Sequence, residues 1–315
     1  MPFDFSLVTA PFRMQPGLRR IDAGASQLTA SIPGGRHLRE KTAVLASFAQ
    51  QVLLATPEFD AAPVLAAIAA EAALQSPVAF AVDPAAGVDA HAPLLGWSIR
   101  NGLPVGDGDP AIGALLVGLP RAQRAIALLC LAFEQDFAVL DGDTATVPWL
   151  AVCLPSRWAP ADKLGRHFAE IHAPIADSAM LTAASASLAR LVTGAERWQR
   201  FVWTISADPH LNQHPAQGAT LWPAGIDADA IAAQASFRSE RQTFIPIAGS
   251  RRAIFTIHVE SVPLVAAVTT GDAAQRLHDA LVSMSAAVLA YRGLTDARDP
   301  LLAWLATRST QRCTE

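Results

Sequence analysis

Apolar residues recur at helical spacing in several parts of the chain, and these parts are predicted to form helices. The longest such segments cover residues 36–54, 60–74, 121–138 and 272–292. In the last of these, apolar side chains repeat three or four positions apart, which predicts one continuous helix with a single buried stripe. Shorter helices are expected over residues 177–191, 227–235 and 299–305. The large aromatic residues of segment 195–206, also at helical spacing, are expected to pack in the core.

Alternating and short apolar runs predict the strands. Residues 236–247 and 253–262, joined by a turn at 249–252, are expected to form a β-hairpin. In its second strand, His258 and Glu260 share one face because side chains alternate along a strand. A buried strand is expected over 150–154, whereas residues 77–118 are predicted to be a long loop with short strands at 78–82 and 95–99. Strands with helices before, between and after them indicate an α+β fold.

Composition and charge restrict the class of protein. The chain has 315 residues, of which 51% are hydrophobic, and a formal net charge of -4. A net negative charge does not favour binding to nucleic acid or to an anionic membrane, because both are negatively charged. Apolar runs at 112–119 and 125–133 are too short to span a bilayer. The start of the chain lacks the pattern of a signal peptide, so a cytoplasmic location is expected. Three cysteines without CxxC spacing suit a reducing compartment: Cys130, Cys153 and Cys313.

Candidate chemistry is concentrated in two places. Segment 149–175 is predicted to be a strand, a turn and a helix that ends on His172, just before Ala173 and Pro174. A histidine there could ligate a metal or haem iron, or could simply cap the helix. Arg238, Glu240 and Arg241 form a dense charge cluster that is either a solvated group of ion pairs or a binding site.

Two histidines lie four positions apart in the loop that follows residue 207. His210 and His214 have the i, i+4 spacing at which two histidines on one face of a helix can ligate the same metal ion. The neighbouring Pro209 and Pro215 argue against a helix, and no cysteine or carboxylate completes a ligand set. The spacing therefore does not predict a zinc site.

Segment 155–174 resembles the signature of the haem-dependent oxidative N-demethylase alpha-subunit family. The matching positions are Pro155, Ser156, Trp158, Pro160, Lys163, Gly165, Arg166, Ile171, His172 and Pro174. A second block resembles the family motif around Arg238, Glu240, Arg241, Gln242 and Thr243. Weaker matches fall on Gly17, Leu18, Arg19, Leu38, Lys41, Gln135 and Asp136.

The resemblance implies a single domain over residues 1–315 built on a PAS-like antiparallel β-sheet. Its core would span roughly residues 78–265, with helical extensions at 36–75 and 272–307. The resemblance further implies haem b with His172 as the iron ligand, and cofactor-binding roles for Lys163, Arg238 and Arg241. Arginine suits haem propionates because its guanidinium can pair with carboxylates in a bidentate manner.

The implied activity is oxidative N-demethylation of a small methylated amine, with O2 as oxidant and release of formaldehyde. Glu240 would bind the amine, since a carboxylate supplies both negative charge and hydrogen-bond acceptors. The sequence contains no GxGxxG fingerprint in a strand-to-helix context and no iron–sulfur cysteine set. A separate reductase subunit carrying FMN and an iron–sulfur cluster is therefore expected to supply electrons.

Two departures from the family pattern keep alternatives open. Val202 stands before Trp203 where family members often have Asn, and His258 stands where the family commonly has Arg. His258 is thus a rival to His172 as the axial ligand. The alternatives to a demethylase are a non-catalytic haem or small-ligand sensor on the same fold, and a structural homologue that has lost its cofactor.

Overall fold

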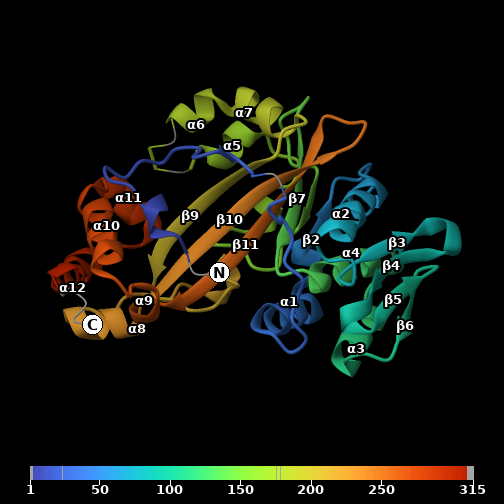
Figure 1. Cartoon of the computed structure of the whole chain (residues 1–315), viewed down its shortest axis with the longest axis horizontal. Coiled ribbons are helices and arrows are strands. Elements are labelled where there is room, and N and C mark those ends of the chain that lie inside the picture. Colours follow the sequence, from blue (N-terminus) through green and yellow to red (C-terminus); the bar gives the residue numbers. More distant parts are fainter. Residues whose placement is uncertain (1–2, 23, 175, 178, 311–315) are drawn as a thin grey trace.

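A seven-stranded antiparallel sheet forms the centre of the molecule in the computed structural model, which describes residues 3–22, 24–174, 176–177 and 179–310 (Figure 1). Its strand order is β1-β9-β10-β11-β7-β8-β2. The strands are β1 Arg19–Arg20, β9 Trp198–Ser206, β10 Ser236–Ile247, β11 Arg252–Pro263, β7 Asp136–Asp141, β8 Trp149–Ala151 and β2 Leu53–Ala55. The predicted hairpin is confirmed as β10 and β11, and so is the α+β class. The PAS-like character of the sheet stays a prediction.

A second, four-stranded antiparallel sheet occupies most of the segment that was expected to be a loop. Its strands are β3 Ala81–Asp83, β4 Val88–Ala92, β5 Trp97–Arg100 and β6 Leu103–Gly106. Helix α3 (Pro110–Gly118) follows. The loop prediction was wrong because strands of three to five residues are too short for alternation to be read from sequence. Gly87 and Gly96, both with positive φ, make two of the turns.

Most predicted helices are present. The confirmed ones are α1 Arg36–Val52, α2 Ala62–Gln75, α8 Ala228–Gln234 and α12 Arg298–Thr310, and α4 (Arg121–Ala132) is present but shorter than expected. The carboxylate of Asp60, which precedes the N-cap residue Ala61, accepts a hydrogen bond from the amide of Ala62, the first residue of α2. Further short helices are α5 Phe168–His172, α6 Ala179–Ala183, α7 Ser185–Val192 and α9 Leu264–Ala267. Single 3-10 turns lie at Phe5–Leu7, Pro84–Ala86, Pro93–Leu95, Pro160–Asp162 and Pro215–Gln217.

Two helix predictions were wrong in extent, and one segment with helical spacing forms a strand. The helix expected over 121–138 ends at Ala132, and Asp136 already belongs to β7. The helix expected over 272–292 is divided into α10 (Gly271–Val282) and α11 (Ala286–Arg292), because the Ser285 side chain caps a new helix by accepting from the Val288 amide. Segment 198–206 is a strand whose backbone pairs with β10. Tertiary hydrogen bonding outweighs the local apolar pattern there.

The apolar core has two main parts. The larger part joins residues of α1–α4 with residues of both sheets, such as Ile68, Leu128 and Phe137. The second packs α10, α11 and α12 against the end of β9 and β10, around Phe237 and Leu277. Within the described residues, no helix combines the length and apolar character needed to cross a bilayer. Cys130 and Cys153 are buried free thiols, and Cys313 lies outside the described residues.

The two faces of the large sheet are covered by different helices. Figure 1 shows α5, α6 and α7 gathered along one side of the long strands, and α1 and α2 on the other. On β10, Glu240 and Phe244 point to one face and Arg241 points to the other, because side chains alternate along a strand. The first we call the α5 face, because Phe168 of α5 packs with Phe244. The second we call the α1 face.

Candidate functional site

The signature segment lies on the α5 face of the large sheet. After β8 the chain turns at Pro155 and Ser156, where Ser156 makes a β-bridge with Gln213. Helix α5 then packs over the sheet through Phe168, which joins an apolar cluster with Phe244 and Phe255. The turn and the helix place Ser156 and His172 over the strands that carry Glu240. The sequence motifs 155–174 and 238–243 therefore meet in space.

His172 is held in one orientation by its own helix. Its Nδ1 lies 2.7 Å from the backbone oxygen of Phe168, and its ring is 4.1 Å from the Phe168 ring, centroid to centroid. Burial, together with the positive charges of Arg200 and Lys163, lowers the pKa of His172 to about 4, although the hydrogen bond to Phe168 acts in the opposite direction. The imidazole is therefore neutral at pH 7 and must donate from Nδ1, since a carbonyl only accepts. Its Nε2 keeps a free lone pair.

Two cationic side chains lie near His172. Lys163 donates to the backbone oxygen of Ile171 at 3.4 Å, and burial lowers the pKa of Lys163. Arg200 comes from β9, directly opposite Gln242 on β10. Burial also lowers the pKa of Arg200, and the negative charge of Glu240 partly offsets that effect. In the described part of the chain, Arg200 has no hydrogen-bond or ion-pair partner, so its guanidinium is free for an anionic ligand.

Glu240 is fixed by a short polar network. The Ser156 hydroxyl donates to Glu240 Oε1, and the Gln242 amide donates to Oε2 at 2.6 Å. Arg238 Nε in turn donates to Ser156 Oγ at 2.8 Å. Val202 lies directly across from Glu240 in the neighbouring strand β9. The carboxylate thus sits in a defined position beside an apolar side chain.

The three charged residues of the second motif do not form one cluster. Arg238 is only 1% exposed and donates to the backbone oxygens of His210 and Leu211 as well as to Ser156. Arg241 lies on the α1 face, where it donates to Gln199 Oε1 and to the backbone oxygen of Ser26. Both arginines are thereby engaged by protein acceptors. Their expected roles in cofactor binding stay predictions.

His258 lies on the face opposite to His172. It is paired in the sheet with Arg241 and therefore points to the α1 face. There its Nε2 is 2.9 Å from Glu134 Oε2, and its ring lies 5.4 Å from that of His37 on α1. The sheet separates the two histidines, so they cannot be alternative ligands within one pocket.

The sequence did not assign roles to Arg200, Ser156 or Gln242. Ser156 and Gln242 were seen only as motif positions. Arg200 was missed because its segment was interpreted by helical spacing. The large apolar residues Phe201, Trp203 and Ile205 occupy every second position, and this period of two is the signal that could have indicated a strand.

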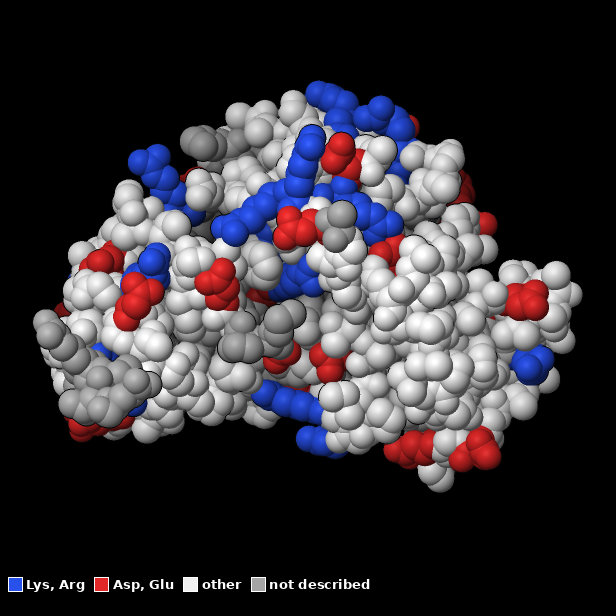
Figure 2. Space-filling view, in the orientation of Figure 1, with Lys and Arg blue, Asp and Glu red and all other residues white. Residues whose placement is uncertain are grey.

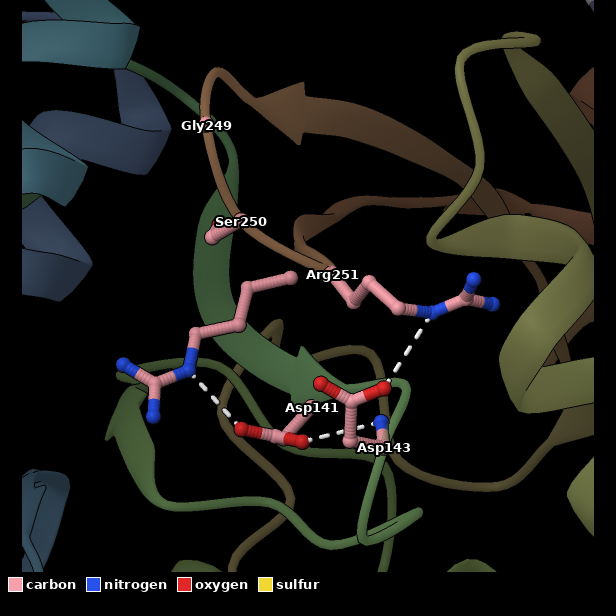
Figure 3. Close-up of a pocket in the computed structure, with 6 residues that line it drawn as sticks. Asp141, Asp143, Gly249, Ser250 and Arg251 are labelled. Atoms are coloured by element: carbon pink, nitrogen blue, oxygen red, sulfur yellow. Dashed lines mark hydrogen bonds and ion pairs between the residues drawn. The ribbon is translucent and has the colours of Figure 1, made fainter.

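A shallow polar pocket lies elsewhere, at the tip of the β10–β11 hairpin (Figure 3). Its charged side chains point toward one another: Arg252 Nε lies 2.8 Å from Asp141 Oδ2, and Arg251 Nε lies 3.2 Å from Asp143 Oδ1. The backbone amide of Asp143 donates to the other Asp141 oxygen. These charges are paired among themselves, so the pocket is better explained as a structural contact between the hairpin and the end of β7.

The Asp141 contact predicts a specific response to acid. Although burial opposes it, hydrogen bonds from Arg252 and from the Thr144 and Asp143 amides hold the pKa of Asp141 below its ordinary value of 3.8. A carboxyl group whose pKa is lower in the folded protein than in the unfolded chain stabilises the fold at pH values above its unfolded-state pKa. That stabilisation is lost as the pH falls through its folded-state pKa. Asp141→Asn should therefore cost about 1 kcal/mol of unfolding free energy at pH 7 and less below pH 4. Urea unfolding of the wild type and the variant, at pH 7 and again below pH 4, measures the cost of the substitution. An equal cost under the two conditions would contradict this prediction.

The side chains around His172 fit a haem group. Haem iron is commonly ligated by a neutral imidazole whose other nitrogen is anchored by a hydrogen bond, as His172 is by Phe168. Arg200, without a partner among the described residues, matches the carboxylate charge of a propionate.

A known protein family matches most of the chain. The family described as "haem-dependent oxidative N-demethylase, alpha subunit-like" matches residues 37–302. That range includes both motifs, His172 and Glu240. The description implies dependence on haem, an oxidoreductase activity and the existence of other subunits at the level of the family. Because the match covers most of the sequence, the chain belongs to the haem-dependent oxidative N-demethylase alpha-subunit-like family.

Proposed function

We propose that this chain is the haem-binding subunit of an oxygenase that removes a methyl group from a small methylated amine. The observation that supports this most strongly is His172, whose Nδ1 is anchored to the Phe168 carbonyl and whose Nε2 has no hydrogen-bond partner among the described residues. Family membership supplies the reaction class. The PAS-like arrangement, with haem between sheet and helix, belongs to the same proposal.

The cofactor in this proposal is haem b. His172 would ligate the iron, and Arg200 and Lys163 would neutralise the propionates, because both are cations close enough to shift the pKa of His172. When bound, haem supplies oxygen activation and oxidising power, whereas the protein supplies the ligand, the pocket polarity and the position of the substrate. A neutral imidazole held at Nδ1 is the state required of an iron ligand.

Glu240 would hold the amine. A small protonated methylamine offers one or two N–H donors and a positive charge, which a carboxylate matches. Ser156 and Gln242 hold Glu240 from both sides, so the amine would be positioned rather than merely attracted. Val202, across from Glu240, offers an apolar surface to the methyl groups. Val202 stands at the position where a polar Asn is common in the family.

Electrons would come from a second subunit. The family description as an alpha subunit implies such partners. We propose a reductase with FMN and an iron–sulfur cluster, because this chain offers no sequence motif for either cofactor. The expected location is the cytoplasm.

One observation favours a second candidate, a haem or small-ligand sensor. Both oxygens of Glu240 already accept hydrogen bonds from the protein. An ammonium group would therefore have to share or displace these donors. If the amine can neither share nor displace these donors, Glu240 has only a structural role. The protein would then bind haem or a small ligand without catalysing a reaction.

The proposal is tested by an absorption spectrum of protein purified from haem-replete cells, with a pyridine haemochrome assay. We expect a Soret band and near-stoichiometric haem b. Formaldehyde release from dimethylamine with O2 and a reductase then separates the demethylase from the sensor. A protein that contains haem but turns over none of the small methylated amines would support the sensor. A protein that is purified without haem and does not bind added haemin would overturn both candidates.

Glu240→Gln is expected to weaken amine binding by about 10–100-fold, since a hydrogen bond to a charged group contributes about 1.5–3 kcal/mol. Titration of dimethylamine against the Soret band measures the dissociation constant. Glu170→Gln, an exposed residue of α5, is the matched control and should leave the constant unchanged. An unchanged constant in Glu240→Gln would remove Glu240 from the amine site.

A further inference from the structure

Four side chains that could bind a metal converge on the α1 face of the large sheet, away from His172. They are His37 in the first turn of α1, Glu134 in the connection between α4 and β7, and His258 and Glu260 on β11. One potential ligand atom from each lies within 4.8 Å of the other three. His37, Glu134 and the β11 pair are far apart in sequence, so the tertiary fold brings these three parts of the site together.

The distances between these atoms are close to those of a metal site. His258 Nε2 is 2.9 Å from Glu134 Oε2 and 3.5 Å from Glu260 Oε1, and His37 Nδ1 is 3.7 Å from Glu134 Oε1. In a tetrahedral zinc site with bonds of about 2.0–2.2 Å, ligand atoms lie about 3.3–3.6 Å apart. Small side-chain rotations would therefore place all four atoms around one ion.

His37 already has the orientation that a ligand needs. Its Nε2 lies 2.7 Å from the backbone oxygen of Val259, which can only accept, so Nε2 carries the hydrogen. In the neutral imidazole this leaves the lone pair on Nδ1, the atom that faces Glu134. Donation of the second nitrogen to a backbone carbonyl is the usual way in which proteins orient a histidine ligand.

The ligand types select the class of ion. Two imidazole nitrogens and two carboxylates suit Zn²⁺ and similar divalent transition metals, whereas Ca²⁺ and Mg²⁺ prefer oxygen ligands alone. The Glu260 side chain is 44% exposed and that of His258 is 18% exposed, so an ion can enter from solvent. His37 and Glu134 are more buried and form the inner wall.

We propose that His37, Glu134, His258 and Glu260 form a binding site for one divalent transition-metal ion, with Zn²⁺ as the best match. Four protein ligands indicate a structural site rather than a catalytic one, because catalytic zinc keeps an open position. The ion would link α1, the α4–β7 connection and β11. His258 takes the place of an arginine common in the family, so the site would be a property of this chain. It is separated by the sheet from the proposed haem pocket and does not depend on haem binding.

The test is isothermal titration calorimetry of ZnCl2 into the full chain, freed of tag and treated with chelator. We expect one equivalent to bind, with His258→Gln weakening the affinity on the order of 100-fold, since even partners behind a metal ligand contribute about 10–100-fold. Mass-spectrometric metal analysis of untreated protein should find zinc in the wild type and lose it in the variant. MgCl2 should not displace the zinc.

The matched control is His278→Gln, which changes a histidine that contacts a single carboxylate, Asp279, on the surface of α10. Its zinc affinity should equal that of the wild type. Glu260→Gln, at the most exposed ligand, is the second variant and should also weaken binding if His258→Gln fails to fold. If the wild type binds no zinc, or binds it as weakly as both variants, the four residues form only a network of hydrogen bonds and ion pairs.

Discussion

His172→Ala is expected to remove haem from the protein while leaving its fold intact. The side chain is partly buried, but within the described ranges its one hydrogen bond is to the carbonyl of Phe168 in the same short helix. Loss of that bond alone leaves no charged group unpaired. Loss of the iron ligand, in contrast, should weaken haem affinity by at least about 100-fold, because removing even a partner behind a metal ligand costs about 10–100-fold.

The measurement is the haem content of purified His172→Ala by pyridine haemochrome, with circular dichroism and the thermal midpoint as checks of folding. Exogenous imidazole should restore part of the Soret band by filling the space of the missing ring. His258→Ala is the informative comparison, because His258 lies across the sheet and should not affect haem. His91→Ala, in the small sheet, controls for the loss of a histidine.

The opposite pattern would change the interpretation. Full haem occupancy in His172→Ala together with loss in His258→Ala would move the iron to the α1 face. It would also contradict the proposed zinc site, because His258 cannot serve two ions at once. Normal haem content in both variants would mean that another side chain ligates the iron.

Disruption of the Lys41–Asp136 pair is expected to have the largest effect on stability. The two side chains are 0% and 1% exposed, and Lys41 Nζ lies 3.1 Å from Asp136 Oδ1. Lys41 also donates to the backbone oxygens of Phe133 and Gln135, and Asp136 Oδ2 accepts from the Leu154 amide. The pair thereby joins α1, the start of β7 and the segment after β8 that leads into the signature.

Asp136→Asn and Lys41→Met should each lower the free energy of unfolding by about 3–5 kcal/mol, because each leaves a buried charge without its partner. A single domain commonly has only about 5–15 kcal/mol in total, so either variant would be close to unfolding. Urea denaturation followed by circular dichroism measures the loss. The double variant should cost less than the sum of the single variants, since neither charge is then left alone.

A surface pair provides the control. Arg276 and Asp272 form an exposed ion pair on α10 with a distance of 2.7 Å, and their side chains are 40% and 71% exposed. Arg276→Met should change the unfolding free energy by less than about 1 kcal/mol, because water screens the interaction. Equal losses in Arg276→Met and Lys41→Met would show that burial does not determine the strength of these pairs.

Local sequence patterns determined much of this protein. Helices α1, α2, α8 and α12 and the β10–β11 hairpin follow from apolar spacing, because a side-chain period depends only on neighbouring residues. The motifs around His172 and Glu240 were sufficient to indicate the family, which the match over residues 37–302 confirms. The motif positions Lys41 and Asp136 were also found by resemblance, but not their contact.

Only the tertiary structure decided which residues share a site. Strand pairing placed Arg200 beside Gln242 and separated Arg241 and His258 from His172. A charge cluster that looks continuous in sequence is divided by the sheet, since alternate residues of a strand face opposite sides. His37, Glu134 and His258 converge although 97 and 124 positions separate them, because α1, the α4–β7 connection and β11 pack together. Contacts at such separations leave no local period, so the sequence alone could not have predicted them.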